Sequence, residues 1–263
     1  MSGSSALFKT DGEKVMQSSK IERSGLQIDV FPTREEASAA AADEVEALLR
    51  KKDSVNLGLA TGSTPLPFYR ELVRRHREEG LSFAQMEGFN LDEYEGLPPE
   101  HPESYDSFMQ QQLYAHIDAR ESHLLPGIYQ NAEEACRAYE EKIVEKGGLD
   151  WQLLGIGGNG HIGFNEPGSP VDSRTRRIEL DERTRRDAVK QFGTLEKVPL
   201  AALTMGIGTI LEAKRIVLMA WGAGKAGILQ KALQGPVTAE VPASFLQTHG
   251  NVRILIDEEA SQG

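Results

Sequence analysis

Residues 151–167 read WQLLGIGGNGHIGFNEP, an apolar run that leads into a glycine-dense loop. The run 151–156 is typical of a buried strand, so we expect the loop at the carboxyl end of a sheet, where open α/β folds bind ligands. Glycines there let the backbone approach a ligand closely. The loop carries an imidazole, His161, and a carboxylate, Glu166. Because a lone histidine beside a turn is most often structural, the assignment of His161 to a site depends on other loops.

Outward from this loop, short apolar runs alternate with longer amphipathic stretches. We predict strands at 28–31, 55–60, 86–91, 151–156, 177–180, 215–220 and 252–256, and helices at 33–51, 65–78, 104–116, 132–145, 182–192 and 225–233. Such alternation is typical of βα units around a parallel sheet. The expected fold class is therefore α/β, a three-layer sandwich with a doubly wound, mostly parallel, Rossmann-like sheet. Its site should form from loops that follow several strands.

The length of 263 residues and the 39% hydrophobic content suffice for one large core. We predict a single domain at 25–263 and a flexible N-terminal extension at 1–24, which is rich in Ser, Lys and Gly. No run approaches the roughly 20 apolar residues of a membrane span, and the start lacks the apolar stretch of a secretory signal. The single cysteine, Cys136, excludes an internal disulfide and favours a core role and a cytoplasmic location.

The charge balance limits the partners that the chain can bind. With 29 basic and 40 acidic residues, the net charge is −11. Such a surface repels the phosphates of nucleic acids and anionic membranes, so we expect neither as a partner. A small phosphorylated ligand would need a local cationic pocket.

The second predicted strand is followed by TGSTP, in which Pro65 suits the first position of a helix. Ser63 or Thr64 could cap that helix. The same loop also directs free backbone N–H groups and hydroxyls at the positive end of the helix, which makes an anion site. We favour phosphate binding by Thr61, Gly62, Ser63 and Thr64 over a simple cap.

A second candidate for anion binding is Lys225, which follows the predicted strand 215–220. It falls in the first turn of a helix, where the helix dipole disfavours a cation by roughly 0.3–1 kcal/mol. A bound anion would compensate for that penalty. The alternative is a solvated lysine, because the penalty is small.

Two matches to G-x-G-x-x-G, at 155–160 and 222–227, lack the context of a dinucleotide site. The first runs into Pro167 where a helix should begin. The second is followed by the proline-flanked segment 235–242, where a strand that ends in a ribose-binding acid is needed. Lys225 also lacks the first glycine and the hydroxyl residue of an ATP-binding P-loop. We therefore expect neither NAD nor ATP.

A third loop, 89–98, carries Asp92 and Glu93 at the end of a predicted strand. A carboxylate in a closed site can act as a general base, and the alternative is a charged turn. The histidines do not favour a metal, because they lie in separate segments without ligand spacing: His101, His116, His123 and His161. An acid–base site without metal fits the pattern better.

Together these segments resemble the glucosamine-6-phosphate deaminase family. The matching segments are 57–65 (LGLATGSTP), 89–94 (FNLDEY), 101–105 (HPESY), 157–167, 202–209 (ALTMGIGT) and 241–247 (VPASFLQ). The resemblance extends in order over residues 28–257. It implies conversion of glucosamine 6-phosphate and water to fructose 6-phosphate and ammonia, an aldose–ketose isomerisation in amino-sugar catabolism that needs no cofactor.

The resemblance also implies roles for the residues. His161 would move the proton that opens the pyranose ring, and Glu166 would orient and charge that imidazole. Asp92 would take the C2 proton and return it at C1, with Glu93 as a structural neighbour. The phosphate would be held by Thr61, Gly62, Ser63, Thr64 and Lys225.

The chain departs from the family pattern at three places. Asn159 stands where many members have an aspartate, so it is expected to position His161 without accepting a proton. Lys190 aligns with a phosphate-binding arginine and keeps the charge but loses bidentate geometry. Arg176 is kept, but the residues at 177–179 differ from those of members that N-acetylglucosamine 6-phosphate activates, so we expect no such activation.

Three alternatives remain open from the sequence. A galactosamine-6-phosphate deaminase would differ only in the C4 stereochemistry of its substrate. A 6-phosphogluconolactonase-like hydrolase also carries a Gly-His pair on such a loop, but Asp92 and the segment 164–167 disfavour it. A non-catalytic sugar-phosphate sensor is suggested by Asn159. In each case the expected partner is a small phosphosugar, and the resemblance allows a homo-oligomer.

Overall fold

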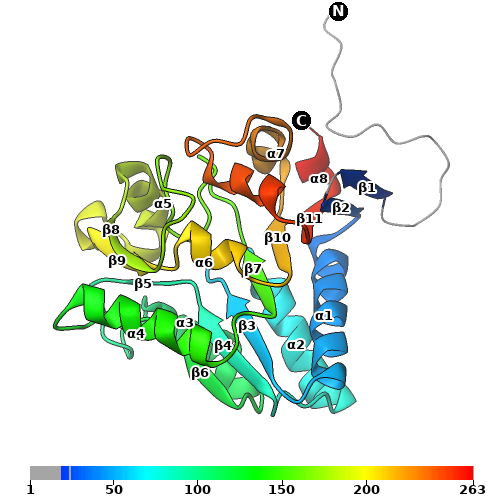
Figure 1. Ribbon diagram of the computed structural model, residues 1–263, viewed down its shortest axis with the longest axis horizontal. Coiled ribbons are helices and arrows are strands. Elements are labelled where there is room, and N and C mark those ends of the chain that lie inside the picture. The colour runs from blue at the N-terminus through cyan, green and yellow to red at the C-terminus, as the bar shows by residue number, and fades with distance from the viewer. Residues whose placement is uncertain (1–18, 24, 263) are drawn as a thin grey trace, which may run out of the picture.

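The computed structural model describes residues 19–23 and 25–262, which form a larger sheet of eight strands and a smaller sheet of three. The larger sheet has the order β1-β2-β11-β10-β7-β3-β4-β6 (Figure 1). Its strands are β1 (Ser19–Arg23), β2 (Leu26–Phe31), β3 (Val55–Leu59), β4 (Met86–Asn90), β6 (Glu121–His123), β7 (Trp151–Leu154), β10 (Ile216–Ala220) and β11 (Val252–Asp257). The smaller sheet, in the order β5-β9-β8, contains β5 (Asp92–Tyr94), β9 (Ala201–Thr204) and β8 (Arg176–Glu179).

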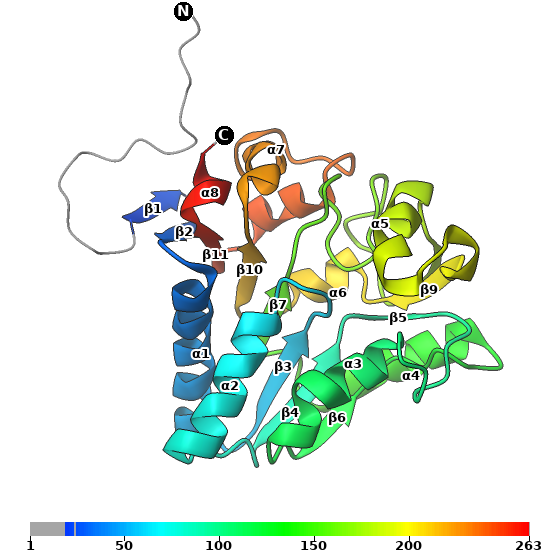
Figure 2. The ribbon, with the colours of Figure 1, turned by 180° about the vertical axis from the view of Figure 1, so that it is seen from behind.

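Helices cover both faces of the larger sheet. The α-helices are α1 (Arg34–Lys51), α2 (Leu66–Glu79), α3 (Tyr105–Gln112), α4 (Ala132–Glu145), α5 (Glu182–Phe192), α6 (Ile207–Leu211), α7 (Ala226–Gln234) and α8 (Glu258–Ser261). The 3₁₀ helices are η1 (Tyr114–His116), η2 (Leu195–Lys197), η3 (Ala223–Lys225) and η4 (Pro242–Thr248). Helices α1 and α2 lie on one face, in front in Figure 2, whereas α4 and α6 lie on the other, in front in Figure 1. The predicted three-layer α/β architecture is confirmed.

The larger sheet is parallel from β2 to β6, and β1 pairs antiparallel with β2 at its edge. Every residue of β3, β4, β7 and β10 is buried. Parallel strands covered on both faces carry continuous apolar runs, which is why these strands could be predicted from the sequence.

The smaller sheet is where the structure differs from the sequence prediction. The segment 177–180 was expected in the parallel sheet, but β8 pairs antiparallel with β9. Asp92 and Glu93 were expected in a loop, but they lie in β5, which pairs with β9. The predicted helix 104–116 is divided into α3 and η1. Strands β5 and β6 have only three residues, too few to show a periodic pattern, and the sequence predicted neither these strands nor β9.

Part of the N-terminal extension proposed at 1–24 belongs to the larger sheet, because Ser19–Arg23 forms β1. The rest of that extension lies outside the described residues. None of the helices in 19–23 and 25–262 combines the length and the apolar character that a membrane crossing requires.

The order of the strands explains where a site can form. Strands β3 and β7 are neighbours at the centre of the larger sheet, and the chain continues from β3 toward β4 but from β7 toward β10. Such a switch in direction leaves a crevice outside the carboxyl ends of the two central strands. Beside this crevice, α5 covers a second apolar cluster, which consists of Tyr94, Phe164, Leu180, Phe192, Val198 and Ala202.

Candidate active site

A cavity of about 340 Å³ opens at the carboxyl ends of β3, β7 and β10. It brings together three loops that lie far apart in the sequence. The sequence-predicted residues that line it are Thr61, Gly62, Ser63, Thr64, Asp92, His161 and Lys225. Further lining residues include Tyr94, Tyr105, Gly157, Gly158, Thr184, Asp187, Ala188 and Gln191. The lining therefore combines an acid, an imidazole and a cation.

The imidazole of His161 lies directly over Gly157. A β-carbon at position 157 would be 2.2 to 2.4 Å from three atoms of the His161 ring, which is closer than real contacts allow. Nδ1 of His161 is 3.4 Å from Oε2 of Glu166, within ion-pair distance. Nδ1 has no hydrogen-bond partner among the described residues. Such loose geometry is common where a base tightens its contacts only when the substrate binds.

Glu166 is held by three side chains. Its Oε2 accepts a hydrogen bond of 2.7 Å from Nδ2 of Asn159, and its Oε1 accepts one from the hydroxyl of Thr184. Burial raises the pKa of Glu166, but the interactions with His161, Thr184 and Asn159 lower it more, so the pKa lies below its ordinary value. Glu166 is therefore a carboxylate at neutral pH, within ion-pair distance of the His161 ring.

Asn159 connects the two ends of the glycine loop. Its amide nitrogen binds Glu166, and its Oδ1 accepts a hydrogen bond of 3.2 Å from the backbone N–H of His161. An amide can make both bonds at once because it offers a donor and an acceptor. This geometry fits the positioning role expected from the sequence.

Asp92 is a buried carboxyl group at the first residue of β5. Burial, and then the nearby charge of Glu93, raise its pKa from 3.8 to about 8. A carboxyl group with so high a pKa is a strong base once it has lost its proton. Asp92 lines the cavity beside the glycine loop, since its Oδ2 is 3.6 Å from the β-carbon position of Gly163, and this position fits that use.

Glu93 serves the fold in a different way. Successive side chains of a strand point to opposite sides, so Glu93 points away from Asp92. Its carboxylate accepts backbone N–H bonds of 2.8 Å from Tyr94, 3.0 Å from Tyr105 and 2.9 Å from Asp106. Burial raises the pKa of Glu93 to about 7 against these hydrogen bonds. The residue thus ties the start of α3 to β5.

The loop at 61–64 joins β3 to α2, whose N-cap is Pro65. Among the described residues no side chain makes a capping hydrogen bond to α2, so the alternative of a simple Ser or Thr cap is wrong. Gly62 has φ +92°, a left-handed conformation that glycine adopts readily. The hydroxyls of Ser63 and Thr64 and the N–H groups at the start of α2 therefore remain available to an anion.

Lys225 lies at the end of η3 and at the N-cap of α7. Its ammonium donates a hydrogen bond of 2.6 Å to the carbonyl oxygen of Ile156. The pKa of Lys225 lies below its ordinary value, chiefly because the ammonium is buried. The charge of Asp187 raises this pKa, and the charge of Arg183 lowers it. Lys190, by contrast, is exposed on α5 and is absent from the lining of the cavity, which does not favour the predicted phosphate contact.

Sequence reasoning missed the contribution of α5. Thr184, Ala188 and Gln191 line the cavity. These positions are four and three residues apart and therefore share one face of the helix. The spacing was visible in the sequence, but nothing in it indicated that this face is turned toward the cavity.

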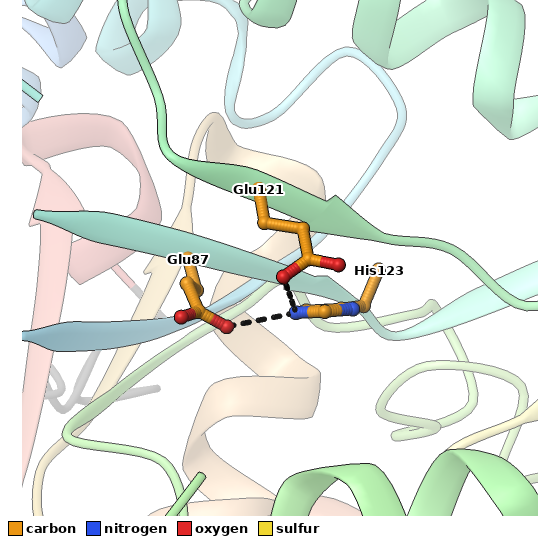
Figure 3. Close-up of side chains that lie close together, drawn as sticks. All are labelled: Glu87, Glu121 and His123. Carbon is orange, nitrogen blue, oxygen red and sulfur yellow. Dashed lines mark hydrogen bonds and ion pairs between the residues drawn. The ribbon is translucent and has the colours of Figure 1, made fainter. Parts of the chain in front are cut away.

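Glu87, Glu121 and His123 offer metal-ligand atoms within 4.8 Å of one another (Figure 3). They lie on β4 and β6, away from the cavity lining. The ammonium of Lys146 is 2.8 Å from Oε2 of Glu87 and 3.5 Å from Oε2 of Glu121. Since this ammonium lies where a metal would need the same oxygens, we assign the group to an ion-pair network. Histidine spacing alone could not reveal it, because the carboxylates come from two strands.

The chain matches one family model, described as glucosamine-6-phosphate isomerases/6-phosphogluconolactonase, over residues 32–254. The glucosamine-6-phosphate deaminase of Bacillus velezensis is 49% identical over 231 residues, which are 87% of this chain and 96% of that protein. The glucosamine-6-phosphate deaminase of an Arthrobacter species is 46% identical over 238 residues, 90% of this chain and 92% of that one.

Solved structures agree with these sequence relatives. A monomeric glucosamine-6-phosphate deaminase superposes with a TM-score of 0.87 at 43% identity, covering 89% of this chain and 98% of that one. A 6-phosphogluconolactonase of Trypanosoma brucei superposes with a TM-score of 0.71 at 22% identity, covering 89% and 97% of the two chains. At that identity the second likeness shows a shared fold alone.

Proposed function

The chain belongs to the family of glucosamine-6-phosphate isomerases and 6-phosphogluconolactonases, and from this premise we propose how it acts as a glucosamine-6-phosphate deaminase. It converts glucosamine 6-phosphate and water to fructose 6-phosphate and ammonia, an isomerising deamination in the catabolism of N-acetylglucosamine. The high identity to several deaminases supports this function over that of a lactonase. The observation that carries the mechanism is the convergence of Asp92, His161 and the loop 61–64 in one cavity.

The first step opens the sugar ring. His161 takes the proton of the anomeric hydroxyl and delivers one to the ring oxygen, which yields the open-chain aldehyde. Glu166 stabilises the imidazolium that forms in between, because its lowered pKa keeps it charged. Asn159 and Thr184 hold Glu166 in place through its two oxygens.

The second step moves a proton from C2 to C1. Asp92 as a carboxylate takes the C2 proton while the ammonium group of the substrate gives a proton to O1, which yields a neutral enolamine. Asp92 then returns its proton to C1, and water replaces ammonia at C2. The positive amine of the substrate favours the ionised form of Asp92, whose pKa is about 8 without it. The loop 61–64 and Lys225 hold the phosphate, so that binding energy orients C1 and C2.

The experiment that tests this function is an assay of fructose 6-phosphate and ammonia together, with glucosamine 6-phosphate as substrate and EDTA present. Equal release of both products is expected. Galactosamine 6-phosphate and 6-phosphogluconolactone are run in parallel. Turnover of either one in preference to glucosamine 6-phosphate would contradict the proposal, and so would tight binding of glucosamine 6-phosphate without product.

Replacement of Lys225 by alanine is expected to raise KM roughly 10- to 100-fold and to leave kcat largely unchanged, the effect of one lost charge-assisted hydrogen bond to a remote phosphate. Steady-state kinetics measure both constants. Lys231→Ala is the matched control, because Lys231 is an exposed lysine on the same helix. A large loss of kcat at unchanged KM would contradict the role assigned to Lys225.

We expect a hyperbolic rate curve that N-acetylglucosamine 6-phosphate does not alter. Arg176 is engaged by Asn165 at 2.8 Å and by Ser169 at 3.1 Å. Arg177 is paired with Glu95, at 2.6 Å between Nη2 and Oε2. Both guanidinium groups are therefore used within the chain. A sigmoidal curve that the acetylated sugar makes hyperbolic would show this expectation to be wrong.

We also propose a domain organisation, a location and an oligomeric state for the protein. A single domain at 25–263 and a cytoplasmic location fit one continuous larger core and a single buried cysteine, Cys136. A homo-oligomer is not needed for the chemistry, because one chain supplies every proposed group, as in the monomeric relative. Light scattering of the purified protein measures its oligomeric state.

A further inference from the structure

The phosphate of the substrate needs positive charge in the cavity, and Lys190, the residue expected to supply it besides Lys225, is absent from the cavity lining. Lys190 is exposed, and α5 turns other residues toward the cavity: Thr184, Asp187, Ala188 and Gln191. Arg183, on the same helix, is also exposed and outside the cavity lining, but its guanidinium lies against Gly158, which lines the cavity. Arg183 precedes Lys190 by seven residues, which corresponds to about 10 Å along a helix.

Arg183 reaches over the glycine loop that also holds His161. A β-carbon at position 158 would be 3.0 Å from Nη2 of Arg183, so the guanidinium lies against the backbone of Gly158. Alanine at this position would therefore press on the guanidinium, whereas glycine leaves room for it.

The loop 155–158 joins Arg183 to the other phosphate-binding groups. Thr64 lies 4.0 Å from the β-carbon position of Gly155. Lys225 donates its hydrogen bond to the carbonyl oxygen of Ile156. Arg183 lies against Gly158. A hydroxyl, an ammonium and a guanidinium thus contact positions within four residues of one loop. The charges of Arg183 and Asp187 both affect the pKa of Lys225, so the three groups lie close together.

The guanidinium of Arg183 makes no hydrogen bond or ion pair with other described residues, whereas the backbone N–H of Arg183 donates to Asp181. Its neighbours differ. Arg185 donates to three backbone carbonyls, and Arg186 pairs with Glu182. Arg183 therefore has its full set of donors available.

We propose that Arg183, rather than Lys190, binds the phosphate of the substrate together with Lys225 and the loop 61–64. A guanidinium can donate two parallel hydrogen bonds to a phosphate, which an ammonium cannot. This inference rests on the proposed function for the identity of the phosphosugar. It adds a residue that determines affinity for the phosphorylated substrate.

The test compares Arg183→Ala, Arg183→Lys, Lys190→Ala and Arg186→Ala. We measure KM and kcat for glucosamine 6-phosphate, and the inhibition constant of inorganic phosphate. Arg183→Ala is expected to raise both KM and the inhibition constant of inorganic phosphate, each roughly 10- to 100-fold, and to leave kcat largely unchanged. Arg183→Lys should show a smaller rise in both constants, because lysine keeps the positive charge but cannot donate two parallel hydrogen bonds to a phosphate. Arg186→Ala, the matched control, should behave as wild type.

Two results would overturn the inference. One is an inhibition constant of inorganic phosphate that is unchanged in Arg183→Ala. The other is a rise in KM and in this inhibition constant in Lys190→Ala, with no rise of either in Arg183→Ala. Calorimetric titration with inorganic phosphate gives the same comparison without turnover. A wild-type protein that binds phosphate through Arg183 but does not deaminate would refute the proposed function and leave this inference standing.

Discussion

Replacement of Asp92 by asparagine is expected to lower kcat by roughly 10²- to 10⁴-fold, the contribution of a positioned general base. The amide has nearly the same shape but cannot accept the C2 proton. Exchange of the C2 proton with deuterated solvent, followed by NMR, should be lost along with product. The affinity for inorganic phosphate should change little, because the phosphate contacts lie on other loops. Turnover close to wild type would exclude Asp92 as the base.

The pH profile gives a second measure of the same residue. Asp92 must be ionised to act, and its pKa is about 8, so kcat/KM should rise with pH up to about that value.

The free energy of unfolding should decrease as the pH rises. The folded state holds protons on Asp92 and Glu93 that the unfolded chain releases near its ordinary carboxyl pKa, so stability present below about pH 4 is lost as pH rises toward 8. Asp92→Asn should flatten this decline, whereas Glu93→Gln should destabilise the protein, because an amide has one oxygen for three N–H donors.

Replacement of Gly157 by alanine is expected to lower kcat/KM by roughly 100-fold or more, since a displacement of about 1 Å at a catalytic group can have that effect. The added methyl group would overlap the ring of His161, so the imidazole or the loop must move. The contact between His161 and Glu166 would then be lost.

Steady-state kinetics measure this loss, and thermal unfolding shows whether the protein remains folded. Gly227→Ala is the control, because a β-carbon at position 227 would have no neighbour within 4 Å. That variant should keep full activity. Equal activity of Gly157→Ala and wild type would show that the position of the ring over Gly157 is not the active one.

The sequence was sufficient to predict the parallel sheet and the loops that meet at its edge. The buried parallel strands are largely apolar, and each of the proposed loops begins where such a strand ends. Asp92 was found by its type and its place after a strand, although the structure puts it in β5. The geometry of β5 depends on pairing with β9, which lies more than 100 residues later in the chain. A pattern of neighbouring residues cannot contain that information.

The sequence could not predict Arg183 as the proposed phosphate ligand in place of Lys190, and the reason is different. Alignment to a family pattern fixes a position in the chain, but the direction of a side chain depends on the rotation of α5 about its axis. One contact that fixes this rotation is that of Phe192, on α5, with Tyr94 of β5, at a ring-centroid distance of 5.2 Å. A helix that rotates or slides by a fraction of a turn presents another cation, and Arg183 takes that place here.

The apolar cluster that α5 covers has six buried side chains, whereas the larger core is extensive and also includes Leu203 of β9. Local unfolding of α5 therefore exposes little apolar surface and requires less free energy than global unfolding. Because the hydrogen bond of Thr184 to Glu166 bridges α5 to the glycine loop, such an opening would also release the carboxylate that lies beside His161. The entrance of the cavity and its acid–base chemistry are thus thermodynamically coupled, and a phosphosugar that binds both sides should suppress the opening by mass action.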